Sequence, residues 1–265
     1  MLDAISGDMG SKYLSRLRAT AVRVLEYTSH VSTPFIAVFL LVHLSAPASA
    51  TLGGSSVSSR TMVRAAVFFG RLIQWFLKLF GREYYQSGYS ELVLLLAPLS
   101  LHAASGLMKR LISSKGGSRP VTHPLTLTGY ATISLFLPIH FLVHRYYPTI
   151  EIPPISGVGP AELDYEFVKT GLNAWPWRSW LLYGGLVLST SLHVADGLQI
   201  LWTSWTGSRP WVLSNRIRRR AAMVGVLTVP ALLGLYVLSR EPFMAFPSLI
   251  NRYRAVYLSS FLYRI

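Results

Sequence analysis

Ser-Leu-His-Ala-Ala-Ser-Gly-Leu at residues 100–107 and Ser-Leu-His-Val-Ala-Asp-Gly-Leu at residues 191–198 are two copies of one histidine-bearing pattern. Each copy lies in a long apolar segment and is followed by Gly-Ser-Arg-Pro, at residues 117–120 and 207–210. A second repeated element, Leu-Val-His, occupies residues 41–43 and 142–144, each with a proline four residues after its histidine. A polar ring in hydrocarbon is costly, so four histidines at repeated positions indicate a duplicated functional site.

The composition indicates a membrane protein. Hydrophobic residues make up 51% of the 265 residues and charged residues 14%, with a mean hydropathy of +0.40, which is more apolar than an ordinary soluble domain. The absence of cysteine excludes a disulfide framework, a thiolate nucleophile and covalent haem attachment. The net charge of +14 comes without a nucleic-acid-binding module. We therefore expect basic residues at the ends of spans near anionic headgroups, and no nucleic-acid partner.

Five apolar segments have about the 20 residues that a bilayer core requires. The fourth is flanked by tryptophans at both ends, as in an aromatic belt. The sequence predicts an all-α polytopic protein in which residues 21–240 hold the transmembrane domain, with internal repeats at about 24–120 and 125–210. Residues 1–20 are predicted to form a polar tail and residues 241–265 an amphipathic tail. The predicted spans are residues 24–46, 89–108, 124–146, 180–202 and 221–239.

Two segments outside the spans have distinctive patterns. Between residues 60 and 82, basic residues spaced by four or seven positions share one helical face, which predicts a helix lying in the membrane interface. A soluble amphipathic helix packed on a partner is the alternative. Residues 147–174 are acidic and rich in proline and glycine, which predicts a solvent-exposed loop. The short basic loops at 109–119 and 209–220 favour a cytosolic N-terminus.

The positions of the histidines within the spans predict two bis-histidine haem sites. The first and third spans run parallel, so His43 and His144 lie at one depth, and the same holds for His102 and His193 in the second and fourth spans. Without cysteine, the haem is b-type. His140, one helical turn before His144, is the alternative ligand.

Four further residues belong to the predicted sites. Gly106 and Gly197 follow their histidines by one helical turn, where a missing side chain would let a flat macrocycle approach the backbone. Arg119 and Arg209 lie in turns that end spans, and they could also meet haem propionates or lipid phosphates.

Simpler interpretations remain open for individual residues. A lone histidine in a membrane span is more often a hydrogen-bonded packing residue than a ligand, although the fourfold repetition favours haem. Asp196 corresponds to Ser105 in the other copy. It is expected either to hydrogen-bond a neighbouring helix or to face a polar groove.

Five spans with one histidine on each of the first four resemble the di-haem cytochrome b anchor of succinate dehydrogenases and fumarate reductases. The repeated Ser-Leu-His-x-Ala-x-Gly-Leu, with Trp-Pro-Trp at residues 175–177, is more similar to the fungal Mdm-ten-complementing protein family. This resemblance implies a multi-pass adaptor of the mitochondrial outer membrane, not an enzyme. It also implies contact with phospholipids, lipid homeostasis at contact sites and possible ATP-independent lipid scrambling.

The same resemblance implies recruitment of a bridge-like lipid-transfer protein of the vacuolar-protein-sorting-thirteen type. The family's recruiting Pro-x-Pro element is not present ahead of Pro34, the first proline of the sequence. The alternative function is a cytochrome b membrane anchor that passes electrons to quinone. Because the sequence holds no flavin- or nucleotide-binding motif, that role needs a partner subunit that supplies electrons.

Overall fold

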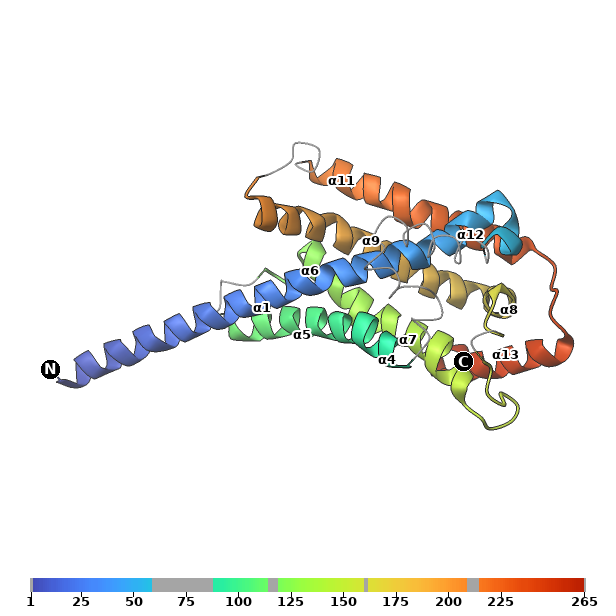
Figure 1. Cartoon of the computed structure of the whole chain (residues 1–265), viewed down its shortest axis with the longest axis horizontal. Helices are drawn as coiled ribbons and strands as arrows, with labels where there is room; N and C mark the ends of the chain where they lie inside the picture. The colour runs from blue at the N-terminus through green and yellow to red at the C-terminus, as the bar shows by residue number, and fades with distance from the viewer. Residues whose placement is uncertain (1, 59–87, 114–118, 160–161, 209–214, 265) are drawn as a thin grey trace. The chain divides into compact units, whose positions relative to one another are not determined.

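The computed structural model describes residues 2–58, 88–113, 119–159, 162–208 and 215–264, which form helices and no strands (Figure 1). The predicted interfacial helix at residues 60–82 lies outside the described residues. The α-helices are α1 (Leu2–Ser49), α4 (Gly88–Glu91), α5 (Ala97–Ile112), α6 (Pro124–Tyr130), α7 (Leu137–Phe141), α8 (Tyr165–Ala174), α9 (Pro176–Thr206), α11 (Arg216–Met223), α12 (Val229–Arg240), α13 (Pro247–Ser259) and α14 (Phe261–Arg264).

Four helical stretches are long and apolar enough to cross a membrane: Lys12–Leu52, Leu92–Ile112, Pro124–Thr149 and Arg216–Arg240. In the third, only 6% of the most apolar stretch is buried inside the protein. Such an exposed apolar surface fits a lipid environment, in which a helix satisfies its own backbone hydrogen bonds. The prediction of an all-helical, multi-pass membrane protein is therefore confirmed at this level.

The predicted fourth span is present as the long helix α9, but α9 is not among the four apolar helices. Its middle carries Ser189, Ser191, His193 and Asp196, which lower its mean hydropathy. Of these, Ser189, Ser191 and Asp196 are buried. The predicted count of five spans thus rests on a helix whose polar residues face protein.

Helix α1 includes most of the predicted polar tail at residues 1–20. It runs without a break from Leu2 to Ser49, so those residues continue the helix that enters the first span. The cause is local: this stretch has no proline before Pro34, and it is rich in Lys, Arg, Leu and Ala, which favour helix.

Wide π-helical turns precede prolines in the spans. Each segment ends two residues before a proline, so the carbonyl four residues before that proline lies within the segment. Proline lacks an N–H group and its ring clashes with that carbonyl, which explains why the preceding turn adopts the wider π form. The segments and their prolines are η2 (Leu92–Leu96) with Pro98, η3 (Ala131–Phe136) with Pro138, η4 (Leu142–Tyr146) with Pro148, and η6 (Val224–Thr228) with Pro230.

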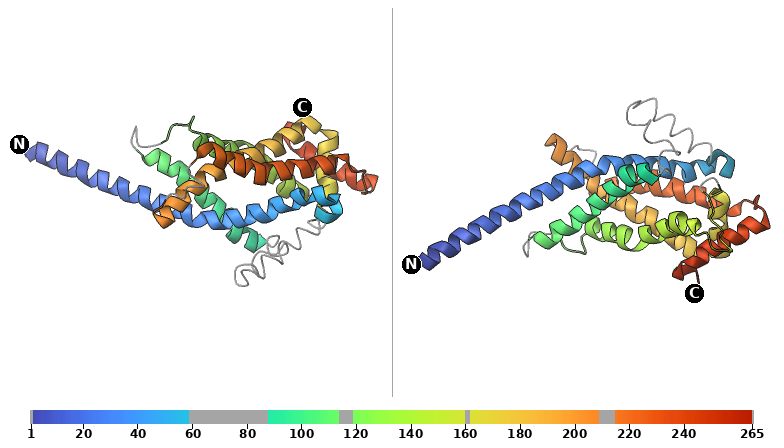
Figure 2. Two further views of the ribbon diagram at one scale, coloured as in Figure 1. Left: turned by 90° about the horizontal axis from the view of Figure 1, so that it is seen from above. Right: turned by 60° about the horizontal axis from the view of Figure 1, so that its bottom comes forward.

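The chain divides into two compact units that do not follow the predicted repeats at 24–120 and 125–210. One unit comprises residues 1–41 and 83–120, and the other comprises residues 42–82 and 121–265. In the larger unit, α9 packs along α6 and η3 on one side and along α11 and η6 on the other (Figure 2). Helix α12 packs on η1 (Ala50–Leu52) and on α8.

Close helix packing in the larger unit depends on glycine. A Cβ atom on Gly234 of α12 would overlap the backbone carbonyl of Pro47 near the end of α1, and one on Gly185 of α9 would overlap the ring of Phe136. Small residues at such crossings are typical of membrane bundles, because association there depends on close packing.

The segment after the third span is a folded cap rather than the predicted exposed loop. The short helix η5 (Tyr147–Thr149) leads through residues 150–164 to α8, and α13 packs against both η5 and α8. The predicted tail at residues 241–265 supplies the inner face of this cap. The buried side chains of the cap form an apolar cluster that includes Phe167, Tyr253, Tyr257 and Tyr263. The sequence did not predict this cluster, because the acidic residues of the segment indicated an exposed loop.

Candidate functional site

His102, in the smaller unit, is held by a backbone carbonyl of the first span. Its ring nitrogen Nδ1 lies 3.1 Å from the carbonyl oxygen of Ser29 and 3.3 Å from the Ser29 hydroxyl. A carbonyl oxygen can only accept, so Nδ1 carries the proton and Nε2 carries the lone pair. A metal-ligating histidine has this arrangement, in which the second nitrogen donates to a fixed acceptor.

His193, in the larger unit, is held in the same way. Its Nδ1 lies 3.0 Å from the carbonyl oxygen of Leu125 on α6. Gly129, one turn later on α6, makes room for the ring, because a Cβ there would come within 2.9 Å of Nδ1 and Cε1 of His193. The repeated pattern predicted the histidine, whereas Gly129 was missed because nothing near it in the sequence repeats.

His43, His140 and His144 come together in the larger unit. The rings of His43 and His140 meet edge to face with centroids 5.9 Å apart, and the rings of His140 and His144 stack at 4.4 Å. The predicted partners His43 and His144 therefore share a cluster, and the predicted alternative His140 contacts both of them.

A hydrogen-bond chain fixes the tautomer of His144. The Tyr257 hydroxyl donates to the carbonyl oxygen of Phe167 at 3.2 Å and lies 3.1 Å from the Tyr183 hydroxyl, which lies 2.9 Å from Nε2 of His144. Because Tyr257 uses its proton on Phe167, Tyr183 donates to Tyr257. Nε2–H of His144 then donates to Tyr183, and the lone pair of His144 lies on Nδ1.

These contacts test how the cluster fits a haem. Two axial imidazoles with metal–nitrogen bonds of about 2 Å have ring centroids on the order of 6 Å apart. The centroids of His43 and His140 lie at about that spacing. His144 donates Nε2–H to a fixed hydroxyl and keeps a lone pair on its other ring nitrogen, which is the arrangement also found at His102 and His193. His140 and His144 are therefore both candidate partners of His43.

The other predicted site residues differ in their surroundings. Among the described residues, a Cβ atom on Gly106 would meet no atom within 4 Å, and one on Gly197 would only touch Leu125, at 4.0 Å. Protein packing therefore does not require glycine at either position. Arg119 is exposed, and its carbonyl accepts a hydrogen bond of 2.9 Å from Arg110. Arg209 lies outside the described residues.

Asp196 hydrogen-bonds a neighbouring helix, which was one of its two expected roles. Its carboxylate accepts bonds of 2.9 Å from Arg219 and 2.5 Å from Arg220, both on α11. Asp196 and Arg219 are buried. Ser105, its counterpart in the first copy, is also buried but lies in the smaller unit. The second copy of the repeat therefore carries a buried ion pair at this position, whereas the first copy has a serine there.

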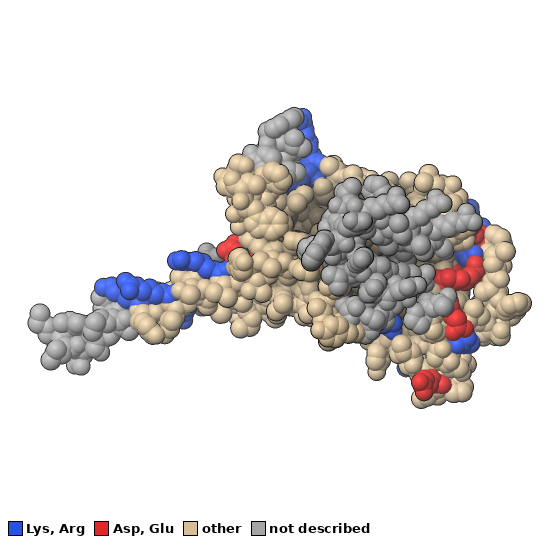
Figure 3. Space-filling model, viewed as in Figure 1, with Lys and Arg blue, Asp and Glu red and all other residues tan. Residues whose placement is uncertain are grey.

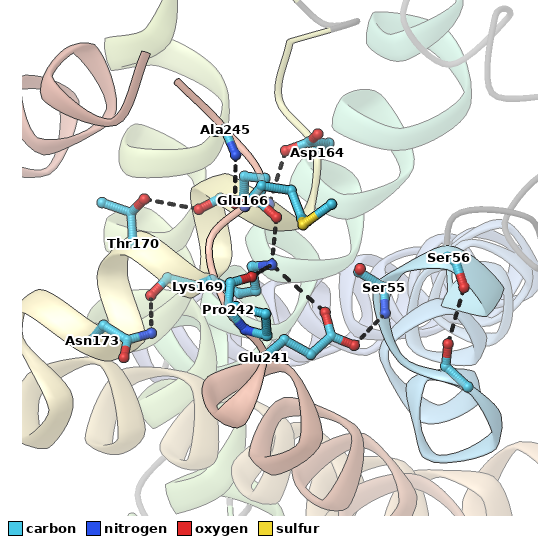
Figure 4. Close-up of polar contacts among 12 residues, drawn as sticks. Ser55, Ser56, Asp164, Glu166, Lys169, Thr170, Asn173, Glu241, Pro242 and Ala245 are labelled. Carbon is cyan, nitrogen blue, oxygen red and sulfur yellow. Dashed lines mark hydrogen bonds and ion pairs between the residues drawn. The ribbon is translucent and has the colours of Figure 1, made fainter. Parts of the chain in front are cut away.

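The most deeply buried charge of the described residues is one that sequence reasoning missed. Lys169 on α8 is fully buried, and its ammonium group lies against the carboxylate of Glu166 and 3.6 Å from that of Glu241 (Figure 4). The ammonium group also donates to the carbonyl of Pro242 at 2.8 Å. In the sequence, the only indication of this ion pair is that one lysine follows four acidic residues, at positions 151, 162, 164 and 166.

The surroundings of two groups on the cap shift their pKa values. The Glu162 carboxylate accepts from the N–H of Gly159 at 2.9 Å and from Arg252 at 2.8 Å, and these bonds lower its pKa. Burial raises the pKa of the Tyr253 hydroxyl. A carboxyl with a lowered pKa adds stability above its ordinary range and loses it as pH falls through the folded-state value. Because 41% of the Glu162 side chain is exposed, solvent screens these interactions and that contribution is small.

Comparison with known proteins supports part of the predicted resemblance. A family model described as MDM10-complementing protein 1, transmembrane domain, matches residues 135–239. The match includes His140, His144 and His193 together with α8, α9, α11 and α12. No curated protein and no solved structure matches the chain.

Proposed function

We propose that this multi-pass membrane protein, similar over residues 135–239 to the transmembrane domain of MDM10-complementing protein 1, acts in lipid homeostasis at the mitochondrial outer membrane. In this proposal it is an adaptor for a bridge-like lipid-transfer protein of the vacuolar-protein-sorting-thirteen type, and it moves phospholipids between leaflets. The family match carries the proposal. The fold supports it, since the described part is a helical membrane bundle.

The N-terminal half of α1 supports contact with a lipid surface. Figure 3 shows Lys and Arg side chains gathered along this part of the helix, and the residues are Lys12, Arg16, Arg18 and Arg23. These residues are exposed and lie next to the apolar part of the first span. A juxtamembrane basic cluster attracts anionic headgroups by about 1 kcal/mol per charge.

Polar side chains on α9 offer candidates for a lipid headgroup path. The Thr132 hydroxyl of η3 donates to Ser189 at 2.9 Å, and the Thr228 hydroxyl of η6 donates to Ser191 at 2.8 Å. Asp196 is a further candidate, and it is paired with Arg219 and Arg220 of α11. In the structure these groups are paired with one another, so a path along α9 requires the pairs to open.

Reconstituted protein is expected to move labelled phospholipid between leaflets without nucleotide, because the sequence holds no phosphate-binding loop to power transport. The measurement is dithionite quenching of a headgroup label in liposomes. Quenching should stop near half in protein-free liposomes and pass well beyond half in proteoliposomes. A helical membrane protein without scrambling activity, at equal mass, serves as the control. Quenching that stops near half with this protein would remove the scrambling part of the proposal.

We further propose b-type haem at two places. His102 and His193 each have the Nδ1-to-carbonyl bond of a ligand, and their pairing rests on the repeated sequence. His43 with His144 forms the second pair, as the repeat register favours, and His140 is the alternative to His144. When bound, haem would supply redox activity or structural reinforcement of the bundle. The protein groups fix the imidazole tautomers.

Protein purified from haem-replete cells is expected to hold about two haems per chain by pyridine haemochrome analysis. Alanine at His43, His102, His144 or His193 should each remove about one equivalent. The control His30→Ala should keep both. A colourless, folded preparation contradicts haem binding altogether. Loss of haem in His140→Ala but not in His144→Ala would make His140 the ligand in place of His144.

The alternative function, a cytochrome b anchor, shares the same histidine geometry. The Nδ1-to-carbonyl bonds of His102 and His193 suit an electron carrier as well as a structural haem. Quinone-dependent oxidation of the dithionite-reduced haem at enzymatic rates, together with failed scrambling, would favour this alternative over the adaptor.

A further inference from the structure

A short apolar loop between α12 and α13 is exposed. Phe243, Met244 and Phe246 expose 41%, 81% and 80% of their surfaces. Three large apolar side chains in four consecutive residues form a patch that water solvates poorly. Nothing in the described residues covers it.

This loop lies where the protein leaves the bilayer. The span ending at Arg240 is directly before it. Leu52, at the end of the first span, is 80% exposed, and Ser55 just beyond it donates its backbone N–H to Glu241 at 2.9 Å (Figure 4). The ends of the first and last of the four apolar helices are therefore tied together beside the loop.

Three backbone groups in and beside the loop are satisfied from the protein side. The N–H groups of Met244 and Ala245 donate to one oxygen of Glu166 at 2.9 and 3.2 Å. The carbonyl of Pro242 accepts from Lys169. In a low-dielectric environment an unsatisfied backbone group costs several kcal/mol, and this cost normally excludes loops from the membrane. Here α8 supplies partners for these three groups.

The charged side chains that hold the loop, Glu166 and Lys169, are buried and neutralise each other. Lys169 neutralises Glu166 and lies near Glu241, so the carboxylate that binds the loop needs no solvent. Gly54 makes this approach possible, because a Cβ atom there would overlap the Glu241 carboxylate and its φ is +68°. A buried carboxylate is stable only with such partners.

We propose that residues 243–246 insert into the headgroup–acyl boundary of the bilayer and that the Glu166–Lys169 pair is the device that permits it. Insertion would remove the three apolar side chains from water while the N–H groups of Met244 and Ala245 and the carbonyl of Pro242 keep their partners on α8. The loop would then fix the depth and tilt of the bundle end that carries α8 and α13. The inference depends only on the chain spanning a membrane, not on its proposed role in lipid homeostasis or haem binding.

The test measures the depth of single nitroxide labels in the full chain reconstituted in vesicles of zwitterionic and anionic phospholipids. The chain has no cysteine, so Met244→Cys and Phe246→Cys each give one labelled site. Glu151→Cys, in the exposed loop at the same end of the larger unit, is the matched aqueous control. Collisions with oxygen, which partitions into lipid, are expected to exceed collisions with a polar nickel chelate severalfold at residues 244 and 246. The ratio should be reversed at residue 151.

A second arm places Phe246→Cys in a Glu166→Ala background. Accessibility of residue 246 to the nickel chelate is expected to rise towards that of residue 151, because the loop loses the acceptor for two N–H groups. Circular dichroism and gel filtration check that this variant folds. If this variant does not fold, the collision ratios measured at residues 244 and 246 with Glu166 unaltered test the proposal by themselves. Nickel collisions dominating at residues 244 and 246 would overturn the proposal, as would low collision rates with both reagents, which would indicate a covering protein.

Discussion

Lys169→Met is expected to lower the free energy of unfolding by about 3–5 kcal/mol, the usual cost of removing one partner from a buried ion pair. The Glu166 carboxylate would stay buried without its counter-ion, and Glu241 and the Pro242 carbonyl would each lose a contact. Because these groups hold the segment after α12 and the turn at Ser55, the loss should loosen the whole cap. The measurement is the unfolding midpoint of the purified protein in detergent.

Lys109→Met is the matched control. Lys109 also faces a carboxylate, Glu26, at 3.7 Å, but 37% and 45% of the two side chains are exposed. An exposed pair contributes about 0–1 kcal/mol, so this variant should unfold close to the parent midpoint. A double variant Lys169→Met with Glu166→Gln should recover part of the loss, because no unpaired charge remains at Glu166. Equal midpoints for Lys169→Met and Lys109→Met would show that burial of Lys169 has little energetic consequence.

Gly234→Ala is expected to destabilise the bundle by about 1–3 kcal/mol, as for an overpacked core. The added methyl group would overlap the backbone carbonyl of Pro47, and a backbone atom cannot swing away as a side chain does. Helix α12 would have to move away from the end of α1, which also strains the nearby contact between Ser55 and Glu241. The thermal unfolding midpoint measures the loss of stability. The yield of crosslinks between α1 and α12 measures the displacement of α12.

Gly225→Ala, in the same span, is the matched substitution. A Cβ atom there meets no atom of the described part of the chain within 4 Å. Alanine favours helix over glycine by about 0.5–1 kcal/mol, so this variant should be as stable as the parent or more so. A similar loss of stability at both positions would indicate that flexibility of the span, not the close approach to Pro47, accounts for the effect.

The repeated histidines and apolar segments could be predicted because each depends on local pattern. Predicted spans at 124–146 and 221–239 correspond to apolar helices Pro124–Thr149 and Arg216–Arg240. Bilayer thickness alone sets their length. The histidines likewise lie on helices, and the Leu125 and Ser29 carbonyls that hold two of them belong to neighbouring spans.

Other features depend on contacts between distant residues. Lys169 reads as an ordinary surface lysine, because Glu241 and Pro242 lie 72 and 73 residues away in the sequence. The cap was mistaken for an exposed loop since its acidic residues face water or the Lys169 pair, while its tyrosines come from the C-terminal segment. The tautomer of His144 also depends on the Tyr183 hydroxyl, which no spacing rule supplies.

The wide turns before Pro98, Pro138, Pro148 and Pro230 have a consequence for how this chain can change in length. A π turn holds one residue more than an α turn, so each of these places carries a spare residue in its span. Loss of that residue, with the proline replaced by a residue that has an N–H group, would close the turn to an ordinary α-helix and leave the two ends of the span facing their original partners. Single-residue deletions combined with this replacement should thus be tolerated at these turns, whereas elsewhere in a span they would rotate one half of the helix against its neighbours. A gap in an alignment with distant relatives at these positions therefore implies a preserved bundle.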